Sequence, residues 1–281
     1  MTHAALFTGS RGLDHPHRLT ANQNLSFQGS VVVGLGFTLT PEQAESLISE
    51  DLRNKDVIMP YINGRDLNSS PTLSPSRWII NFFDWPLEKA ETYVEPMAIV
   101  RTQVKPQRDN VRRKAHRQYW WHYGDKRPAL YEAISSLRRI LVVGQTGKYH
   151  SFTFLPPGMV YDQKLIIFAS QSYSFFALLQ STLHVEWALK RGSTLKRDPV
   201  YTPSNCFETF PFPPVTAEQR QHLDRIGETY HAYRQEIMLA RREGLTEAYN
   251  RFHDVDDIET NITELRDLHV EMDQAVAATY G

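Results

Sequence analysis

The residues best suited to chemistry lie in one basic and aromatic segment, residues 101–127. Asp109 and Asp125 are its only acidic residues, whereas a solvated helix face normally mixes both signs. We call its first seven cations the basic strip: Arg101, Lys105, Arg108, Arg112, Arg113, Lys114 and Arg117. Cations that neutralise phosphates release condensed counterions, so the strip predicts contact with a nucleic-acid backbone. The alternative is a basic patch that pairs with acidic residues of the same chain.

Three aromatic residues, Tyr119, Trp120 and Trp121, follow the basic strip after Gln118. Aromatic rings can stack on nucleic-acid bases, and they can equally fill a hydrophobic core. Both interpretations stay open for this group.

Other short patterns give weaker indications. Gly34-Leu-Gly36 lacks the third glycine and the helix start that a dinucleotide or S-adenosylmethionine loop needs. Asp162-Gln-Lys164 matches only the second half of a metal-dependent nuclease pattern. The Pro-Pro pairs at 156–157 and 213–214 lack the flanking residues of an amino-methyltransferase loop. The eleven histidines and the single Cys206 show no metal-ligand spacing, so we expect no catalytic residue, cofactor or metal in this chain.

The overall charge hides a strong asymmetry along the chain. The 281 residues carry a net charge of −1, with 41% apolar and 22% charged residues, which is ordinary for one or two globular domains. Residues 101–139 carry a net +8, and residues 215–281 a net −7. One cysteine fits a reducing compartment, and neither a signal peptide nor an apolar run of membrane-spanning length is present. We therefore expect a cytoplasmic protein without a membrane partner.

The elements that must position these residues predict an α/β fold of the mixed α+β type. Strands are expected at 30–34 and on to 39, 78–83, 140–143, 151–154 and 165–169. Helices are expected after Thr40, at 84–93, from 96 towards 121 with a break at Pro106, at 128–137, and at 172–191 before Gly192. Irregular segments are expected at 1–24 (an arm), at 61–67 (a turn with positive φ at Asn63-Gly64) and at 199–214 (a linker).

The last 67 residues predict a small acidic helical module, residues 215–281. Thr216 and Gln219 form a capping-box pattern at its start. Apolar residues then recur at helical spacing in two stripes: Leu223, Ile226, Tyr230, Tyr233 and Ile237, then Leu265, Leu268, Met272 and Val276. We expect these stripes to form a helix-on-helix core, and a face that docks a partner subunit is the alternative.

An ordered series of motifs resembles one known family. The early motifs are Phe27-Gln-Gly29, Gly34-Leu-Gly36-Phe37, Leu39-Thr-Pro-Glu42, Pro60-Tyr-Ile-Asn-Gly-Arg-Asp-Leu-Asn68 and Ile80-Asn-Phe-Phe-Asp-Trp-Pro86. The later motifs are Val104-Lys-Pro106, Trp120-Trp121, Arg127-Pro-Ala-Leu-Tyr131, Phe207-Glu-Thr-Phe-Pro211 and Tyr249-Asn-Arg-Phe-His253. Together they resemble the C-terminal half of the MmeI-like adenine-specific DNA methyltransferases. This group includes type IIL restriction–modification enzymes and related methyltransferases of phage-defence systems.

The resemblance implies a DNA target-recognition domain at 25–214, followed by the C-terminal helical module at 215–281. In that family a separate N-terminal domain binds S-adenosylmethionine and flips the target adenine, and this chain lacks those catalytic motifs. We therefore expect the specificity half of an N6-adenine DNA methyltransferase, with two partners: double-stranded DNA and an N-terminal methyltransferase domain or subunit. A metal-dependent nuclease fragment that uses Asp162 and Lys164, or a protein-interaction subunit that docks through its acidic tail, are the alternatives.

Position and chemistry, rather than matched family residues, indicate where bases are contacted. Polar side chains on loops that can enter the major groove are the candidates. The first loop supplies Gln145, Thr146, Lys148, Tyr149 and His150, and the second, around Gly192, supplies Lys190, Arg191, Lys196 and Arg197. Lys164 is expected to contact a phosphate. Asn63, Asp66 and Asn81 are expected to brace turns.

Overall fold

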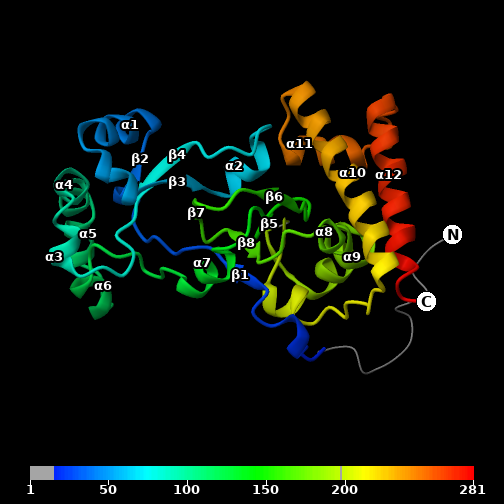
Figure 1. Ribbon diagram of the computed structural model, residues 1–281, viewed down its shortest axis with the longest axis horizontal. Helices are drawn as coiled ribbons and strands as arrows, with labels where there is room; N and C mark the ends of the chain where they lie inside the picture. The colour runs from blue at the N-terminus through cyan, green and yellow to red at the C-terminus, as the bar shows by residue number, and fades with distance from the viewer. Residues whose placement is uncertain (1–15, 197) are drawn as a thin grey trace.

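Two four-stranded sheets occupy the middle of the computed structural model, with helices at both ends (Figure 1). The structure describes residues 16–196 and 198–281, so most of the expected N-terminal arm and Arg197 lie outside it. The described end of that arm forms a 3₁₀ turn, Thr20–Asn22, in which the buried Asn22 amide donates to the carbonyl of Phe210 over 2.8 Å. The mixed α/β class with C-terminal helices is confirmed.

The first sheet is antiparallel throughout and holds the predicted central strands. Its order is β1 (Ser26–Gln28), β8 (Leu165–Phe168), β5 (Ile140–Gly144) and β6 (Thr153–Leu155). Every residue of β5 and β8 is buried. Alternate residues of β5 belong to cores on opposite faces of the sheet, which explains why these strands are continuous apolar runs.

The second sheet is smaller and partly parallel. Its order is β2 (Thr38–Leu39), β4 (Arg77–Ile80), β3 (Ile58–Ile62) and β7 (Val160–Tyr161), with β3 and β7 parallel. Residues 162–164 connect β7 of this sheet directly to β8 of the first sheet. The predicted strand at 30–34 is absent, because Val33 (φ 53°) and Gly34 (φ 121°) turn the chain out of the extended conformation.

Short helices cover the second sheet at one end of the molecule (Figure 1). They are α1 (Pro41–Glu50), α3 (Leu87–Ala90), α4 (Val94–Gln103), α5 (Lys105–Asp109) and α6 (Lys114–Gln118), with a 3₁₀ turn at Leu52–Asp56 and another at Leu35–Phe37. The helix expected after Thr40 is confirmed, and Thr40 and Gln43 form a capping box at its start. The long helix predicted from residue 96 is broken twice. Helix α5 begins at Lys105 with Pro106 in its first turn, close to the predicted break, and residues 110–113 separate α5 from α6.

Two shorter helices lie between the sheets and the ends, α2 (Gly64–Ser69) and α7 (Pro128–Ile134). The turn predicted at 61–67 is wrong, because β3 runs to Ile62 and Asn63 then caps α2 with an extended backbone, φ −125°. Asn63 and the buried Asp66 brace this cap through a hydrogen bond of 2.9 Å. Asn81 braces its own loop by accepting from the backbone of Phe83 over 2.9 Å.

The other end of the molecule is helical and shares its core with the first sheet. Its helices are α8 (Tyr173–Gln180), α9 (Thr182–Arg191), α10 (Ala217–Arg241), α11 (Leu245–His253) and α12 (Thr260–Ala277). The predicted helix at 172–191 is split at Ser181, which ends α8 and caps α9. Helix α10 packs closely on α8 at Gly227, where a Cβ atom would stand 2.5 Å from the carbonyl oxygen of Tyr173.

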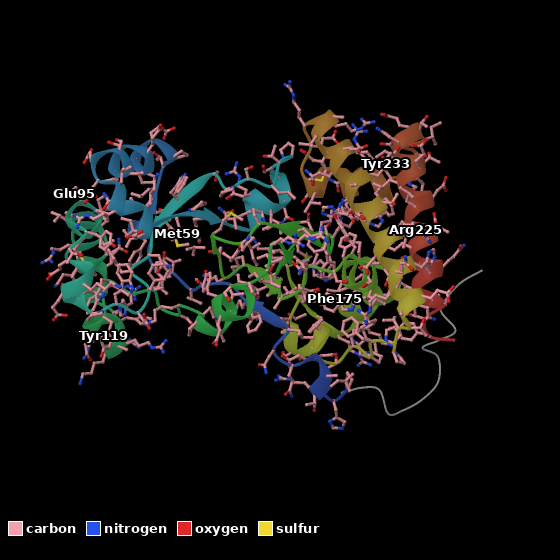
Figure 2. The ribbon with its side chains drawn as sticks, viewed as in Figure 1. Met59, Glu95, Tyr119, Phe175, Arg225 and Tyr233 are labelled. Atoms are coloured by element: carbon pink, nitrogen blue, oxygen red, sulfur yellow. The ribbon has the colours of Figure 1, made fainter. Side chains whose placement is uncertain are left out.

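The two apolar stripes of the C-terminal helices are used inside the molecule. Leu223, Ile226, Tyr230 and Ile237 of α10 lie in one core with Leu265 and other residues of α12. Figure 2 shows Phe175 among the dense side chains of this core, between the first sheet and α10. The helix-on-helix core is therefore confirmed, and a partner-docking role for these stripes is wrong because seven of their nine residues are buried and the other two, Tyr233 and Leu268, pack against the same core.

The segment predicted as a linker at 199–214 is an integral part of the fold. It starts with β10 (Asp198–Val200), which pairs with β9 (Ser193–Leu195) in a hairpin, and continues through a π-helical turn, Pro203–Phe207. Tyr201, Phe207 and Phe210 are buried. The linker prediction is wrong because its prolines punctuate turns that carry large core residues. Within the described residues, no helix is both long and apolar enough to cross a membrane.

Candidate nucleic-acid interface

A groove of about 550 Å³ lies where the two sheets meet. Its lining residues come from six separate segments of the chain: Val32, Val33, Gly34, Thr38, Tyr61, Asn63, Gly64, Arg65, Arg77, Thr146, Asp162, Gln163, Lys164 and Leu195. The connection 162–164 between the sheets is therefore exposed at the groove. Of the predicted site residues, Thr146 and Lys164 line it directly.

The two predicted base-contacting loops lie next to each other at this groove. Gln145 donates its backbone N–H to the carbonyl of Lys164 over 2.7 Å, and Tyr201 donates to the carbonyl of Gln145 over 2.8 Å. An antiparallel bridge joins Thr146 to Val200 of the β9–β10 hairpin. Segments about 50 residues apart in sequence are thus fixed in one unit by backbone hydrogen bonds.

The rest of the first loop turns away from the groove towards α11. Lys148 donates from Nζ to Oδ1 of Asn250 over 2.6 Å, and the ring of Tyr149 stacks on His253 at 4.6 Å. His150 is only 2% exposed, and burial lowers its pKa to about 4. The prediction that His150 contacts a base is wrong, because its side chain belongs to the protein interior.

The second loop divides in the same way. Lys190 and Arg191 end α9, and the guanidinium of Arg191 lies 5.0 Å from the Trp187 ring centroid, so both are outside the groove lining. Lys196 lies at the exposed tip of the hairpin in a left-handed conformation, φ 60°, next to Leu195 of the groove. Arg197 lies outside the described residues.

Two exposed arginines at the groove, Arg65 and Arg77, were missed from the sequence. Arg65 follows the cap of α2, and Arg77 begins β4. The pairing of Tyr61 with Arg77 in neighbouring strands brings Arg77 to the groove, and Arg65 follows Gly64, where a Cβ atom would stand 3.8 Å from Cβ of Lys164. Only the strand order reveals this, since neither residue belongs to a cluster of cations in sequence.

Asp162, the acid of the half nuclease pattern, is engaged in structure. Its carboxylate accepts a hydrogen bond from the Tyr61 hydroxyl and another, of 2.8 Å, from the backbone of Lys164. Burial and this carboxylate raise the pKa of Tyr61. Within residues 16–196 and 198–281, no group of three or more histidine, cysteine or acidic side chains could hold a metal ion. The geometry thus gives Asp162 a role in shaping the turn between the sheets.

Arg108 of the basic strip is not on the surface. It is 2% exposed, and its Nη2 donates to the carbonyls of Val32 (3.0 Å) and His122 (3.1 Å). Burial lowers the pKa of its guanidinium. The prediction that Arg108 contacts phosphate is wrong. Its guanidinium is buried and donates to the backbone of Val32, which lines the groove, and of His122.

The other strip residues are exposed or half-exposed. Arg101 pairs with Glu91, and Lys105 pairs with Asp109 over 2.8 Å. Arg112, Arg113, Lys114 and Arg117 are exposed around the start of α6. Arg117 also donates from Nη1 to the carbonyls of Val111 (2.6 Å) and Arg112 (3.0 Å), which fixes the loop that presents these charges.

The basic strip adjoins the groove and not the acidic helices. A Cβ atom on Gly34 of the groove would stand 3.7 Å from Oε1 of Gln107 in α5. Helices α4–α6 and α10–α12 lie at opposite ends of the long axis (Figure 1). In the described chain, the ion pairs of the strip join only nearby acids. The alternative in which the strip pairs with the acidic tail is therefore wrong.

The aromatic residues after the strip mainly fill the core. Trp120 and Trp121 are each 6% exposed, and Trp121 donates from Nε1 to the carbonyl of Trp85 over 2.9 Å. Tyr119, labelled at the edge of this end in Figure 2, is 46% exposed. Stacking of the tryptophan pair on bases is thus ruled out by burial, and Tyr119 alone of the three is accessible.

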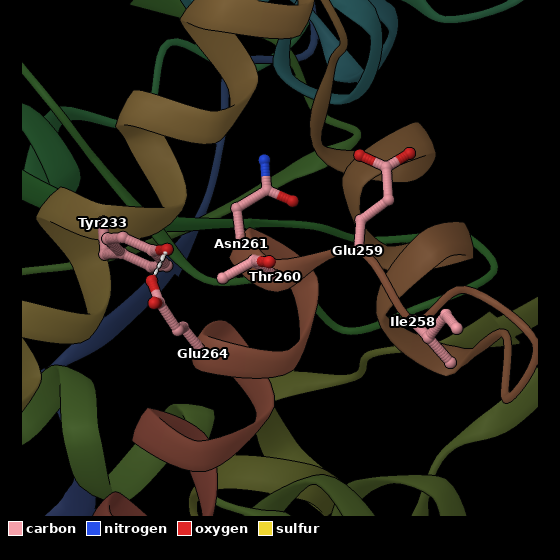
Figure 3. A pocket seen from close by; sticks show the side chains of 6 residues that line it. All are labelled: Tyr233, Ile258, Glu259, Thr260, Asn261 and Glu264. Carbon is pink, nitrogen blue, oxygen red and sulfur yellow. Dashed lines mark hydrogen bonds between the residues drawn. The ribbon is translucent and has the colours of Figure 1, made fainter.

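A second hollow lies between α10 and the start of α12 (Figure 3). Tyr233 donates to Glu264 there, and Glu259 and Asn261 both accept from Arg241. Its polar groups therefore satisfy one another, and its acids would repel phosphate. This hollow is unsuited to nucleic acid.

Fold and groove together define a binding domain, in which an α/β scaffold presents a cation-lined groove at the junction of two sheets. A family model described as the MmeI target recognition domain matches residues 16–214, and the chain belongs to this family. No curated protein matches the chain.

Two solved structures are similar to this fold. The structure of the type IIL restriction–modification enzyme MmeI in complex with DNA has a TM-score of 0.72 and 17% identity, over 92% of this chain and 32% of that one. The type IIG restriction endonuclease BpuSI has a TM-score of 0.43 and 11% identity, over 94% of this chain and 31% of that one. This chain thus spans about a third of the length of each.

Proposed function

We propose that this chain is the sequence-recognition part of a larger restriction–modification enzyme and that the groove receives duplex DNA. The observation that carries the proposal is the meeting of Thr146, Lys164 and the β9–β10 hairpin in one groove beside the basic strip. Membership of the MmeI target-recognition family supports it. The similar structure of MmeI was determined with DNA, which makes DNA the natural ligand to test.

The chemistry of the groove divides the contacts into two classes. Arg65, Arg77, Gln163 and Thr146 carry donors and acceptors suited to base edges, with arginine matching guanine O6 and N7. The exposed cations Lys164, Arg112, Arg113, Lys114 and Arg117 are suited to phosphates, which position the duplex without reading it. This division adds Arg65 and Arg77 to the base-contacting residues predicted from the sequence.

The catalytic part of the enzyme belongs to a different domain or subunit in this proposal. That part would bind S-adenosylmethionine and methylate adenine at N6, and the present chain would hold it over one sequence. Support comes from the motif resemblance described above and from the length comparison, because this chain covers 32% of the MmeI chain. A nuclease centred on Asp162 has less support, since its carboxylate is engaged by Tyr61 and Lys164.

Binding to duplex DNA across a series of salt concentrations tests the proposal. Six or more phosphate contacts would give a log–log slope steeper than about −5. Replacing Arg112 and Arg113 together with Ala should weaken binding to all duplexes alike and reduce the slope by about two, because both cations are exposed.

The matched control is Arg220→Ala, an exposed arginine on α10 at the acidic end, which should leave both affinity and slope unchanged. A binding constant that does not respond to salt, or equal losses for the two arginine changes, would contradict the proposed interface.

A further inference from the structure

Val33 combines exposure with an uncommon backbone conformation at the groove. Its φ is 53°, and 42% of the residue is exposed although it is apolar. A β-branched residue rarely adopts the left-handed region, because its side chain crowds the backbone. Such a conformation persists only where the surroundings fix it, and it is enriched at ligand-binding sites.

Three groups hold this residue in place. Val31 exchanges both backbone hydrogen bonds with Asp125, each of 3.0 Å. The carbonyl of Val32 accepts from the buried guanidinium of Arg108 over 3.0 Å. The Cγ2 methyl group of Val33 packs against Gly124. A Cβ atom on Gly124 would lie 2.7 Å from this methyl group, so a larger residue would not fit at position 124. The side chain is therefore presented to the groove by a rigid support.

We propose that Val33 recognises the 5-methyl group of a thymine in the DNA major groove. The inference rests on the proposed function and names one specificity determinant within it. In the major groove, thymine is the base that presents a methyl group, and an apolar side chain is the group that discriminates it. Val33 supplies such a surface beside the polar groups of Gln163 and Lys164.

Arg108 acts as a positioning residue in this arrangement. It touches no DNA. Its hydrogen bonds to the carbonyls of Val32 and His122 connect α5 to the segment that carries Val33. Leu195 is the other exposed apolar residue that lines the groove, at 55%. It lies near the hairpin tip, beside Lys196, whereas Val33 is held by Arg108 through Val32 and packs on Gly124, so we assign the methyl contact to Val33.

The test is a binding selection from two libraries of duplexes with a randomised centre, one made with thymine and one with deoxyuridine in its place. The full chain is the protein used. Loss of one buried methyl contact corresponds to about a fourfold change in affinity. We expect the wild type to prefer thymine at one position and to lose that preference in the deoxyuridine library.

Val33→Ala should remove the preference at that position alone, with no further change between the libraries. Val270→Ala, the same change at an exposed valine of α12, is the matched control and should behave like wild type. Arg108→Ala should weaken the preference for thymine at the same position. The selection is carried out on folded protein. Circular dichroism confirms that each variant is folded.

Two results would overturn the assignment and leave the proposed function intact. One is sequence-selective binding with no thymine–deoxyuridine difference at any position. The other is a difference that Leu195→Ala abolishes and Val33→Ala does not. Absence of any sequence preference in both libraries would overturn the proposed function itself, together with this inference.

Discussion

Helices α4–α6 and α10–α12 lie at opposite ends of the molecule (Figure 1), carry net charges of opposite sign and are built in different ways. At the basic end, helices α4, α5 and α6 are short, and none has a side-chain hydrogen bond at its N-cap. At the acidic end, α10 runs for 25 residues from a capping box, and α12 runs for 18. The basic end displays charges on loops and short helices, whereas the acidic end buries continuous apolar stripes.

Each end also contains one buried arginine. Arg108, at the basic end, donates to two backbone carbonyls near the groove. Arg234, at the acidic end, is 1% exposed and donates to the carbonyl of Phe152 (2.7 Å) and the hydroxyl of Tyr249 (2.9 Å). The comparison separates two tasks: Arg108 supports the chain segment that lines the groove, and Arg234 joins α10 to the first sheet and to α11.

The largest expected effect is acid unfolding through the acidic end. Burial lowers the pKa of His150 to about 4, of His184 to about 3 and of His231 to about 3, and all three lie around the core shared by the first sheet and the C-terminal helices. Because the folded pKa values lie below the unfolded value of about 6.5, the unfolded chain binds more protons. Stability is therefore full above pH about 6.5 and falls towards the folded values.

Urea unfolding between pH 7 and 4.5 measures this loss of unfolding free energy. Each histidine contributes about 1.4 kcal/mol per pH unit, so the total should be several kcal/mol. Carboxylates with ordinary pKa values titrate mainly below this window. His231→Gln removes one of the three titrating groups and should flatten the pH dependence by roughly a third. An unfolding free energy that stays constant across the window would show that these imidazoles are not buried as described.

The second prediction compares the two arginines directly. Arg234→Ala should reduce the unfolding free energy by about 3 kcal/mol, because it leaves a cavity and an unpaired buried carbonyl. Arg108→Ala should cost about 2 kcal/mol for its two lost hydrogen bonds. Urea unfolding gives both values, and DNA selection on folded protein separates the roles: Arg108→Ala changes sequence preference, and Arg234→Ala does not. Equal effects on preference would end the distinction between the ends.

Local sequence patterns predicted the acidic end well and the basic end poorly. Helical spacing in α10 and the capping box at Thr216 depend on neighbours in sequence, so they were visible there. The burial of Arg108 depends on the carbonyl of Val32, 76 residues away, so charge periodicity alone placed it wrongly on the surface. The fold class and the central strands were predictable because β5 and β8 are buried on both faces, which makes them continuous apolar runs in the sequence.

The groove shows the same limit more sharply. Thr146 was predicted from loop position and Lys164 as a phosphate contact, but Arg77 joins them through the pairing of β3 with β4, and Arg65 through the pairing of β3 with β7. The linker prediction at 199–214 failed because prolines that end helices can also frame buried turns, as they do around Phe207. The residues of a site between two sheets are brought together by the order of the strands, and local patterns in a single sequence do not reveal that order.

The smallest expected effect is also the one that best sharpens the contrast between the ends. Val33→Gly removes a side chain from a left-handed residue, which relieves about 1 kcal/mol or more of backbone strain. It also loses packing against Gly124 and adds chain entropy to the unfolded state, at a combined cost of similar size. We expect the unfolding free energy to change by less than about 1 kcal/mol, while the thymine preference disappears.

Val270→Gly, in the regular interior of α12, has no strain to relieve and should lose about 0.5–1 kcal/mol of unfolding free energy with DNA binding unchanged. Urea unfolding of the two variants side by side measures the difference. If Val33→Gly proves the more destabilising, its conformation contributes to folding, and the basic end is not the strained, ligand-directed surface that the comparison describes.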